Sequence, residues 1–213
     1  MRILCKNISN IRIYDGQNLG VCMKEFDEQK KREIYYKIGE ITALINNIEI
    51  NLNHPYIKSR ISWEVYFSHK LYNQLFRIIK NNFISTDEIN KICENMRSKK
   101  VTHTLSFTHL DIRPHNIIYN NGDIFVIDAE ECEFGDPLCE LAFIQLEWSF
   151  WEMHDTLLKG YKSVIDIDLN NELYFYYKLE RLGLILDMHY NHNCKNEWSE
   201  FFLNIFNKTK KGY

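Results

Sequence analysis

The sequence predicts an α+β fold that is mainly helical, and three observations support this. Apolar residues recur at helical spacing over much of the 213-residue chain. Asn121 and Gly122 lie between two short β-branched runs, which is the signal of a β-hairpin. Hydrophobic residues make up 45% of the chain and aromatic residues 14%, enough for a substantial core. We therefore expect helices packed around a small amount of antiparallel sheet.

The first 26 residues are expected to form two short strands. Ile8 to Tyr14 is one apolar run, and Leu19 to Phe26 is the next. Asp15 and Gly16 lie between them and have the composition of a turn. Residues 1 to 26 thus read as a small piece of sheet ahead of the helices.

Three helices are expected next, at residues 28 to 48, about 62 to 80, and 86 to 98. Ser85 and Glu88 have the spacing of a capping box at the start of the third helix. The apolar side of the first helix is formed by Ile34, Ile38, Ile41, Ala43, Leu44 and Ile45. A strand-like segment, Thr104 to Thr108, follows the third helix.

The middle of the chain concentrates the polar side chains that a functional site needs. In the predicted hairpin, Asn116 lies at the entry and Asp128 at the exit, so the tight turn brings these two positions together. Asp111 lies on the loop just before the hairpin. Three oxygen-bearing side chains are therefore expected to converge.

This convergence suits magnesium-dependent phosphoryl transfer. Mg²⁺ prefers a few carboxylate or amide oxygens and keeps its other positions for water and phosphate. A separate carboxylate must orient the acceptor hydroxyl and take its proton. His109-x-Asp111, with Asn116 five residues later and Asp128 downstream, matches the spacing of protein kinases.

The rest of the chain is expected to be helical. Asp136 and Pro137 have the pattern of an N-cap followed by proline at the first helical position. Leu141 to Leu158 is apolar nearly all round, which predicts a buried central helix. Residues 171 to 190 and 197 to 208 predict two further helices.

The stretch from residue 105 to 142 resembles the aminoglycoside phosphotransferase family and its choline-kinase-like relatives. The segment HLDIRPHN has a proline before the residue that precedes Asn116, and Asp128 is followed by GDPLCELA at 135 to 142. A protein kinase would have Asp-Phe-Gly from Asp128, where this chain has Asp-Ala-Glu. Glu140 stands where the family more often has Asp.

The resemblance implies a kinase-like fold and an ATP- and Mg²⁺-dependent O-phosphotransferase that acts on a small hydroxylated molecule. It implies that Asp111 is the catalytic base and that Asn116 and Asp128 bind the metal. It also implies that His109 organises the loop. The residues expected around the adenine are Met23, Glu25 and Phe26 of a hinge, together with Ile118 and Ile127.

The resemblance further implies a division into lobes. Residues 1 to 26 would be a two-strand remnant of the N-terminal lobe with the hinge, and residues 27 to 213 the helical C-terminal lobe with the catalytic loop and acceptor pocket. In this alignment most of the lobe that grips the ATP phosphates, including its lysine, is missing. A competing alignment makes Lys24 that lysine and Glu33 or Glu40 its partner. It needs two further strands in a region whose pattern is helical.

Two alternatives to an active kinase remain open. His103, His109 and His115 with Asp111 could form a zinc site, although their six-residue spacing fits no helix face. The chain could instead be a non-catalytic or truncated kinase-like module, or one half of a split enzyme. An incomplete lobe would expose apolar surface and so favour association.

Composition narrows the partners and the location. A net charge of −3 without a basic stripe argues against nucleic acid, and no apolar run approaches the length that spans a membrane. Six cysteines with no CxxC spacing and no secretory leader predict reduced thiols and a cytoplasmic protein. The expected partner is a small-molecule acceptor. Glu147, Glu152 and Asp155 would favour a cationic one, although surface acids are common.

Overall fold

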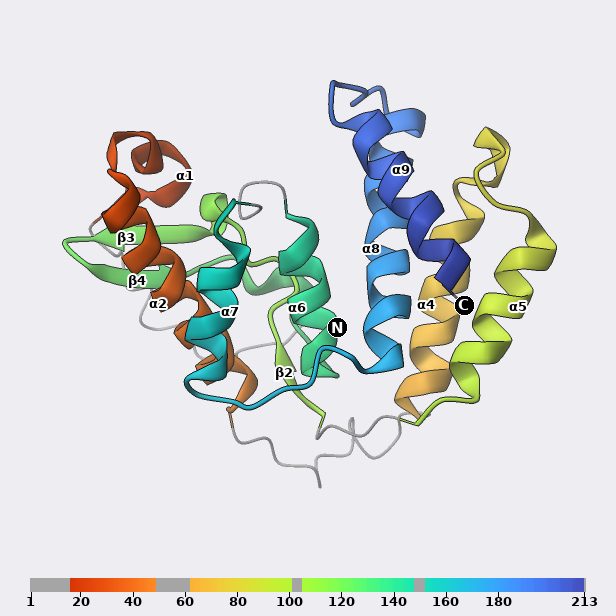
Figure 1. Cartoon of the computed structure of the whole chain (residues 1–213), viewed down its shortest axis with the longest axis horizontal. Coiled ribbons are helices and arrows are strands. Elements are labelled where there is room, and N and C mark those ends of the chain that lie inside the picture. Colours follow the sequence, from red (N-terminus) through yellow and green to blue (C-terminus); the bar gives the residue numbers. More distant parts are fainter. Residues whose placement is uncertain (1–15, 49–61, 101–104, 148–151, 213) are drawn as a thin grey trace. The chain divides into compact units, whose positions relative to one another are not determined.

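The computed structural model describes residues 16–48, 62–100, 105–147 and 152–212 (Figure 1). The described chain is mainly helical with two small antiparallel sheets, which confirms the predicted fold class. The strand predicted at Ile8 to Tyr14 lies outside the described residues.

Contacts divide the chain into two compact units, which are described separately below. The first contains Met1–Glu49, Leu105–Glu140 and Glu147–Ile167, and the second contains Ile50–Thr104, Leu141–Leu146 and Asp168–Tyr213. The lobe boundary predicted between residues 26 and 27 does not coincide with this division, and it stays a prediction.

The sheets lie in the first unit. Strands β1 (Gln17–Asn18), β3 (Ile117–Asn120) and β4 (Asp123–Val126) form one sheet in the order β1-β3-β4. Strands β2 (Ser106–Thr108) and β5 (Glu133–Gly135) form the other. The β3–β4 turn has positive φ at Asn121 (49°) and Gly122 (103°), as a type I′ turn requires, so the predicted hairpin is confirmed.

The strand predicted at Leu19 to Phe26 was wrong. The segment forms a short helix, α1 (Leu19–Cys22), followed by a 3₁₀ turn, η1 (Met23–Glu25). The side chain of Asn18 accepts a hydrogen bond from the Gly20 N–H at 3.0 Å, which caps the helix. Leu19 and Cys22 are both buried, and their three-residue separation suits one helix face, whereas a strand would point them to opposite faces.

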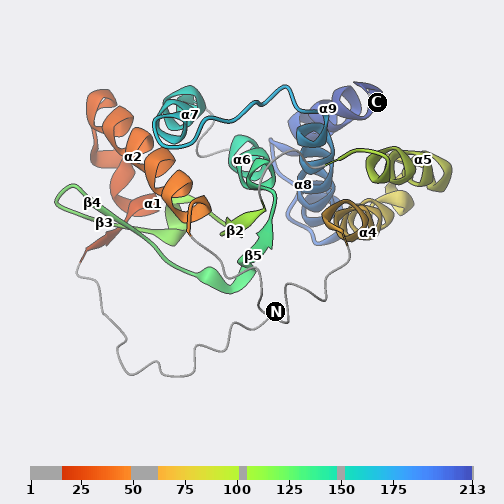
Figure 2. The same ribbon diagram turned by 90° about the horizontal axis from the view of Figure 1, so that it is seen from below.

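Helices α2 (Glu28–Asn46) and α7 (His154–Lys162) pack side by side in the first unit (Figures 1 and 2). Each helix has a glycine at the contact. A Cβ added to Gly39 would lie 1.9 Å from the Leu157 carbonyl oxygen, and one on Gly160 would lie 2.0 Å from that of Tyr36. The helices approach this closely only because neither position carries a side chain.

A polar network ties these helices to β2. The Tyr161 hydroxyl donates to Asn46 Oδ1 at 2.9 Å, and Asn46 Nδ2 donates to the Phe107 carbonyl at 2.9 Å. The Tyr161 hydroxyl and both polar atoms of the Asn46 side chain therefore have hydrogen-bond partners, as buried polar groups need. The network fixes the strand that leads into the candidate site.

The single helix predicted from Leu141 to Leu158 was wrong in its middle. Helix α6 (Pro137–Leu146) ends before the non-helical Glu147, and α7 begins at His154. The residues of α6 are buried nearly all round, whereas α7 buries one face against α2. The predicted N-cap is confirmed, since Asp136 Oδ1 accepts from the Leu138 N–H at 2.9 Å.

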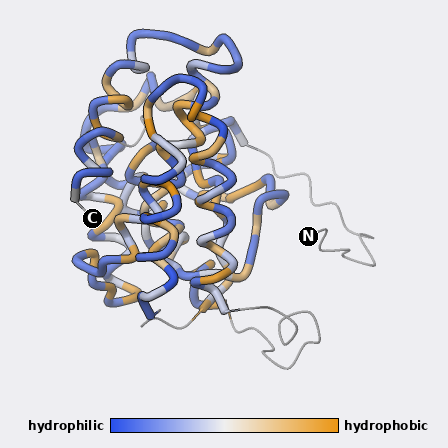
Figure 3. Tube along the Cα trace, turned by 90° about the vertical axis from the view of Figure 1, so that its right-hand side faces the viewer, coloured by the Kyte–Doolittle hydropathy of each residue, from blue (hydrophilic) through white to orange (hydrophobic). Residues whose placement is uncertain are grey.

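The second unit contains helices, and its main ones match the predicted segments. They are α4 (Trp63–Phe76), α5 (Thr86–Arg97), α8 (Glu172–Asn191) and α9 (Ser199–Thr209), with 3₁₀ turns η2 (Ile79–Asn81) and η6 (Lys210–Gly212). The capping box of Ser85 and Glu88 is present. Hydrophobic and hydrophilic residues both recur within the helical turns of the trace (Figure 3), as expected of helices that bury one face.

Aromatic residues form part of the core of the second unit, beside buried Leu and Ile side chains. The rings of Phe67 and Tyr177 meet edge to face with centroids 4.7 Å apart. Trp63 Nε1 donates to the Tyr177 hydroxyl at 2.8 Å, so both buried polar groups are satisfied. Across the described part of the chain, no helix is both long and apolar enough to cross a membrane.

Candidate active site

A buried carboxylate holds the loop that follows β2. Glu140, in the first turn of α6, is completely buried and accepts the N–H groups of His109 at 2.5 Å and Leu110 at 2.9 Å. Leu110 has φ of 61°, a left-handed conformation that a branched residue rarely adopts. The two charge-assisted hydrogen bonds stabilise this conformation. The left-handed residue changes the direction of the backbone immediately before Asp111.

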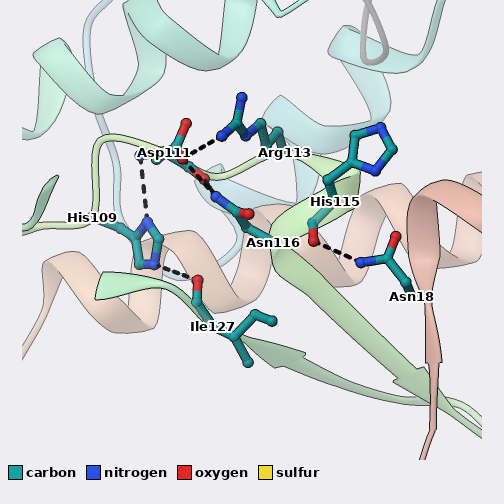
Figure 4. Close-up of polar contacts among 7 residues, drawn as sticks. All are labelled: Asn18, His109, Asp111, Arg113, His115, Asn116 and Ile127. Atoms are coloured by element: carbon teal, nitrogen blue, oxygen red, sulfur yellow. Dashed lines mark hydrogen bonds and ion pairs between the residues drawn. The ribbon is translucent and has the colours of Figure 1, made fainter. Parts of the chain in front are cut away.

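His109 connects the loop to the end of the hairpin (Figure 4). Its Nδ1 accepts from the Asp111 N–H at 3.3 Å, so Nε2 carries the proton and donates to the Ile127 carbonyl at 3.2 Å. Burial lowers the pKa of His109 below its usual 6.5, which favours this neutral ring. Both nitrogens are occupied, so the ring does not offer a metal ligand.

Asp111 is held by two donors on one of its oxygens. Oδ2 accepts from Asn116 Nδ2 at 2.6 Å and forms an ion pair with Arg113 at 3.0 Å (Figure 4). Asn116 Nδ2 also donates to the Asp111 carbonyl at 3.0 Å. Among the described residues nothing bonds to Oδ1 of Asp111. The carboxylate is therefore fixed in direction, while its Oδ1 makes no hydrogen bond to a described residue.

The hairpin brings Asn116 and the residues beside Asp128 together, as predicted. The Ile127 N–H donates to the Asn116 carbonyl at 2.9 Å, and Asp128 follows with φ of 66° and an exposed side chain. Asn116 is buried and spends its amide nitrogen on Asp111. Its Oδ1 and the Asp128 carboxylate bond to no described residue. This donor set is hard oxygen, and it fits Mg²⁺.

The zinc alternative gains no support in the described part of the chain. There, no three or more His, Cys, Asp or Glu side chains gather in a way that could hold a metal ion. His115 is exposed, and its ring lies against α1, where a Cβ on Gly20 would approach within 2.7 Å. His103 lies outside the described residues.

The predicted adenine-contacting residues are brought together only in part. Met23 and Glu25 lie in η1, and the Phe26 ring meets Tyr119 of β3 edge to face at 5.1 Å. Ile118, next to Tyr119, is half-buried, and Ile127 is 36% exposed at the end of the hairpin. The structure thus places Phe26 beside the strand that carries Ile118. The nucleotide-binding roles of all five residues stay predictions.

Sequence reasoning missed two residues of this site. Arg113 stands between Asp111 and Asn116 in the sequence, and its ion pair with Asp111 could have been expected from that separation and charge. In the sequence, Glu140 stands out only as a departure from the family pattern. Its place in the GDPLCELA segment was a signal for a role, but its hydrogen bonds join residues 30 and 31 positions apart, so only the folded structure reveals them.

Comparison of the sequence with protein-family models identifies the family of the chain. The model of the APH phosphotransferase enzyme family matches residues 15–162, which include the whole loop and hairpin. The chain belongs to this family. The predicted resemblance is thereby confirmed, and the phosphotransferase family membership with it. No curated protein matches the sequence.

Solved structures show the same fold. APH(2″)-IIa in complex with gentamicin is 16% identical, with a TM-score of 0.61 over 94% of this chain and 69% of that one. ADP-bound aminoglycoside phosphotransferase APH(2″)-Ib is 20% identical, with a TM-score of 0.57 over 87% and 66%. Choline kinase LicA from Streptococcus pneumoniae is 16% identical, with a TM-score of 0.53 over 95% and 69%. The chain therefore spans about two thirds of the structures it matches.

Proposed function

We propose that the chain is an ATP- and Mg²⁺-dependent O-phosphotransferase acting on a small hydroxylated molecule. The observation that carries this proposal is the hydrogen bond of 2.6 Å between Asn116 and Oδ2 of Asp111, which leaves Oδ1 open beside the end of the hairpin. A base for a hydroxyl acceptor needs this combination of a fixed direction and a free oxygen. The ADP and the gentamicin in the two phosphotransferase structures agree with a nucleotide donor and a small acceptor.

Within this proposal the residues divide the work. Asp111 would orient the acceptor hydroxyl through Oδ1 and take its proton as the oxygen attacks the γ-phosphorus of ATP, while the bond from that phosphorus to the β–γ bridging oxygen breaks and ADP leaves. Asn116 Oδ1 and the Asp128 carboxylate would hold Mg²⁺, which neutralises phosphate charge when bound. Glu140 and His109 keep the loop in place, so the reactive groups are positioned before substrate arrives.

A paired substitution tests this role. Asp111→Asn should lower Mg·ATP-dependent transfer by at least about 10²-fold, because the amide cannot take the proton. Asp123→Asn, an exposed carboxylate at the turn of the same hairpin, is the control and should keep full activity. ATP consumption would be measured against a panel of aminoglycosides, choline-like alcohols and sugars. Equal activity of Asp111→Asn and the wild type would remove Asp111 from the base role.

A second candidate is a kinase-like module that needs a partner to hold the nucleotide. The observation in its favour is that the chain spans about two thirds of the matched structures. Calorimetry with Mg·ATP separates the two candidates. Saturable binding by the chain alone supports the enzyme, whereas a folded protein that binds nothing at millimolar nucleotide supports the partner-dependent module.

A further inference from the structure

Three cations gather over two buried aromatic rings in the second unit. Arg181 of α8 has its guanidinium carbon 4.9 Å from the ring centre of Phe143 on α6, and Lys70 Nζ of α4 lies 5.7 Å from the same ring. Lys178, also on α8, has Nζ 4.8 Å from the ring centre of Tyr174. Figure 2 shows α8 and α4 next to each other. The residues of the cluster therefore come from three helices and all lie within the second unit.

Two of these cations lack a counter-charge. Lys178 and Arg181 are three residues apart on α8, so like charges lie next to each other on one face. Neither makes a hydrogen bond or an ion pair with any residue in the described ranges, and Arg181 Nε is buried without a partner. The helix positions three and four residues away from each carry no acid. By contrast, Lys99 forms an ion pair with Glu172 of the same helix.

An arrangement of this kind is unfavourable by itself. Both side chains are half-buried, and desolvation lowers the pKa of Lys178 because it disfavours the ammonium form. The aromatic faces attract the cations, but they do not replace the hydrogen bonds that water supplied. A structural core would be better served by apolar residues at these positions. A bound anion would supply the counter-charge and the hydrogen-bond acceptors that these two side chains lack.

We propose that Lys178 and Arg181 bind an oxyanion, a phosphate or carboxylate group, of a small molecule. The guanidinium offers several N–H donors in one plane, which match two oxygens of such a group, and the ammonium supplies a second charge. Lys70 adds a third cation at the Phe143 ring. If the second unit holds the acceptor of the proposed phosphotransferase, that acceptor is an alcohol that carries an acidic group and is not a cation. This consequence rests on the proposed function.

Thermal unfolding with simple anions tests the site directly. Inorganic phosphate should raise the melting temperature of the wild-type chain by about 2–4 °C over potassium chloride of equal ionic strength. Lys178→Met and Arg181→Met should lose this rise. Acetate in place of phosphate shows whether the site takes a carboxylate as well. Lys91→Met removes an exposed lysine of α5 in the same unit and should keep the rise.

Two further variants show where the anion binds and keep the test informative if a Met variant does not fold. Arg113→Gln should keep the phosphate effect, because its cation lies in the candidate active site. Arg181→Lys preserves the charge and should retain part of the rise even if Arg181→Met does not fold. The proposal is overturned if phosphate leaves the wild type unchanged, if both Met variants respond like the wild type, or if the rise disappears in Arg113→Gln.

Discussion

The substitution Glu140→Gln tests whether one buried carboxylate holds the catalytic loop. In the native chain, the two oxygens of Glu140 accept the N–H groups of His109 and Leu110 at 2.5 and 2.9 Å. Glutamine has nearly the same shape, but it offers one acceptor oxygen and an NH₂ group. One backbone N–H therefore faces another donor, and the remaining bond loses its charge assistance.

The expected loss of stability follows from these two bonds. A hydrogen bond to a charged group contributes about 1.5–3 kcal/mol, and a buried donor left without a partner costs about 1–3 kcal/mol. Leu110 adds about 1–2 kcal/mol of left-handed strain that the bonds now restrain. Since the strain is released as the loop relaxes, we expect a net loss of about 2–4 kcal/mol. Movement of the loop displaces Asp111, so transfer activity should fall by at least about tenfold.

Urea unfolding and ATP consumption measure the two effects in the same preparation. Glu94→Gln, at an exposed position of α5, is the matched control and should change stability by less than about 0.5 kcal/mol. A Glu140→Gln variant as stable as Glu94→Gln would refute the reasoning, because it would show that the two N–H groups do not depend on the carboxylate.

Three further predictions concern packing, pH and thiol chemistry. Gly39→Ala should destabilise the chain by at least about 3 kcal/mol, because the new Cβ would overlap the Leu157 carbonyl, whereas Gly122→Ala meets no atom and should cost about 1–2 kcal/mol from its positive φ. The stability of the wild type should fall as the pH drops below 6.5, because the unfolded chain then binds a proton that buried His109 resists; His109→Gln should weaken this slope in urea titrations. Cys194 is the exposed thiol among the described cysteines, so Cys194→Ser should remove one fast-reacting thiol in an Ellman assay.

Each of these predictions has a distinct contrary result. Similar unfolding free energies for the two alanine variants would show that α2 and α7 separate without cost. An unchanged pH slope in His109→Gln would assign the effect to other histidines, such as His189, whose pKa burial also lowers. Unaltered labelling of Cys194→Ser would mean that a more buried thiol reacts, although burial raises the pKa of Cys93 to about 11 and that of Cys132 to about 12.

Local sequence signals predicted the parts of the chain whose structure depends on neighbouring residues. Asn121 and Gly122 accept positive φ, so the hairpin and its convergence of Asn116 with the Asp128 end could be predicted. The caps at Ser85 and Asp136 were predicted for the same reason, because a capping side chain bonds within its own turn.

Long-range packing decided the rest. Leu19 to Phe26 has the apolar composition of a strand, but burial of Leu19 and Cys22 on one face makes it helical. The end of α6 before Glu147 and the start of α7 at His154 do not follow from the apolar pattern of Leu141 to Leu158, which continues through both. Helical propensity was present, and tertiary contacts overrode its continuity.

The sequence by itself therefore determined which residues can converge, since Asp111, Asn116 and Asp128 are spaced along a loop and a hairpin, and the phosphoryl-transfer roles proposed for them rest on that spacing. Only the tertiary structure decided how Asp111 is held. Glu140 supports the loop from 30 residues away, and Arg113 shares Oδ2 with Asn116. The physical reason is that spacing sets which residues can meet across a short turn, whereas a buried hydrogen bond between distant segments exists only after the fold has excluded water.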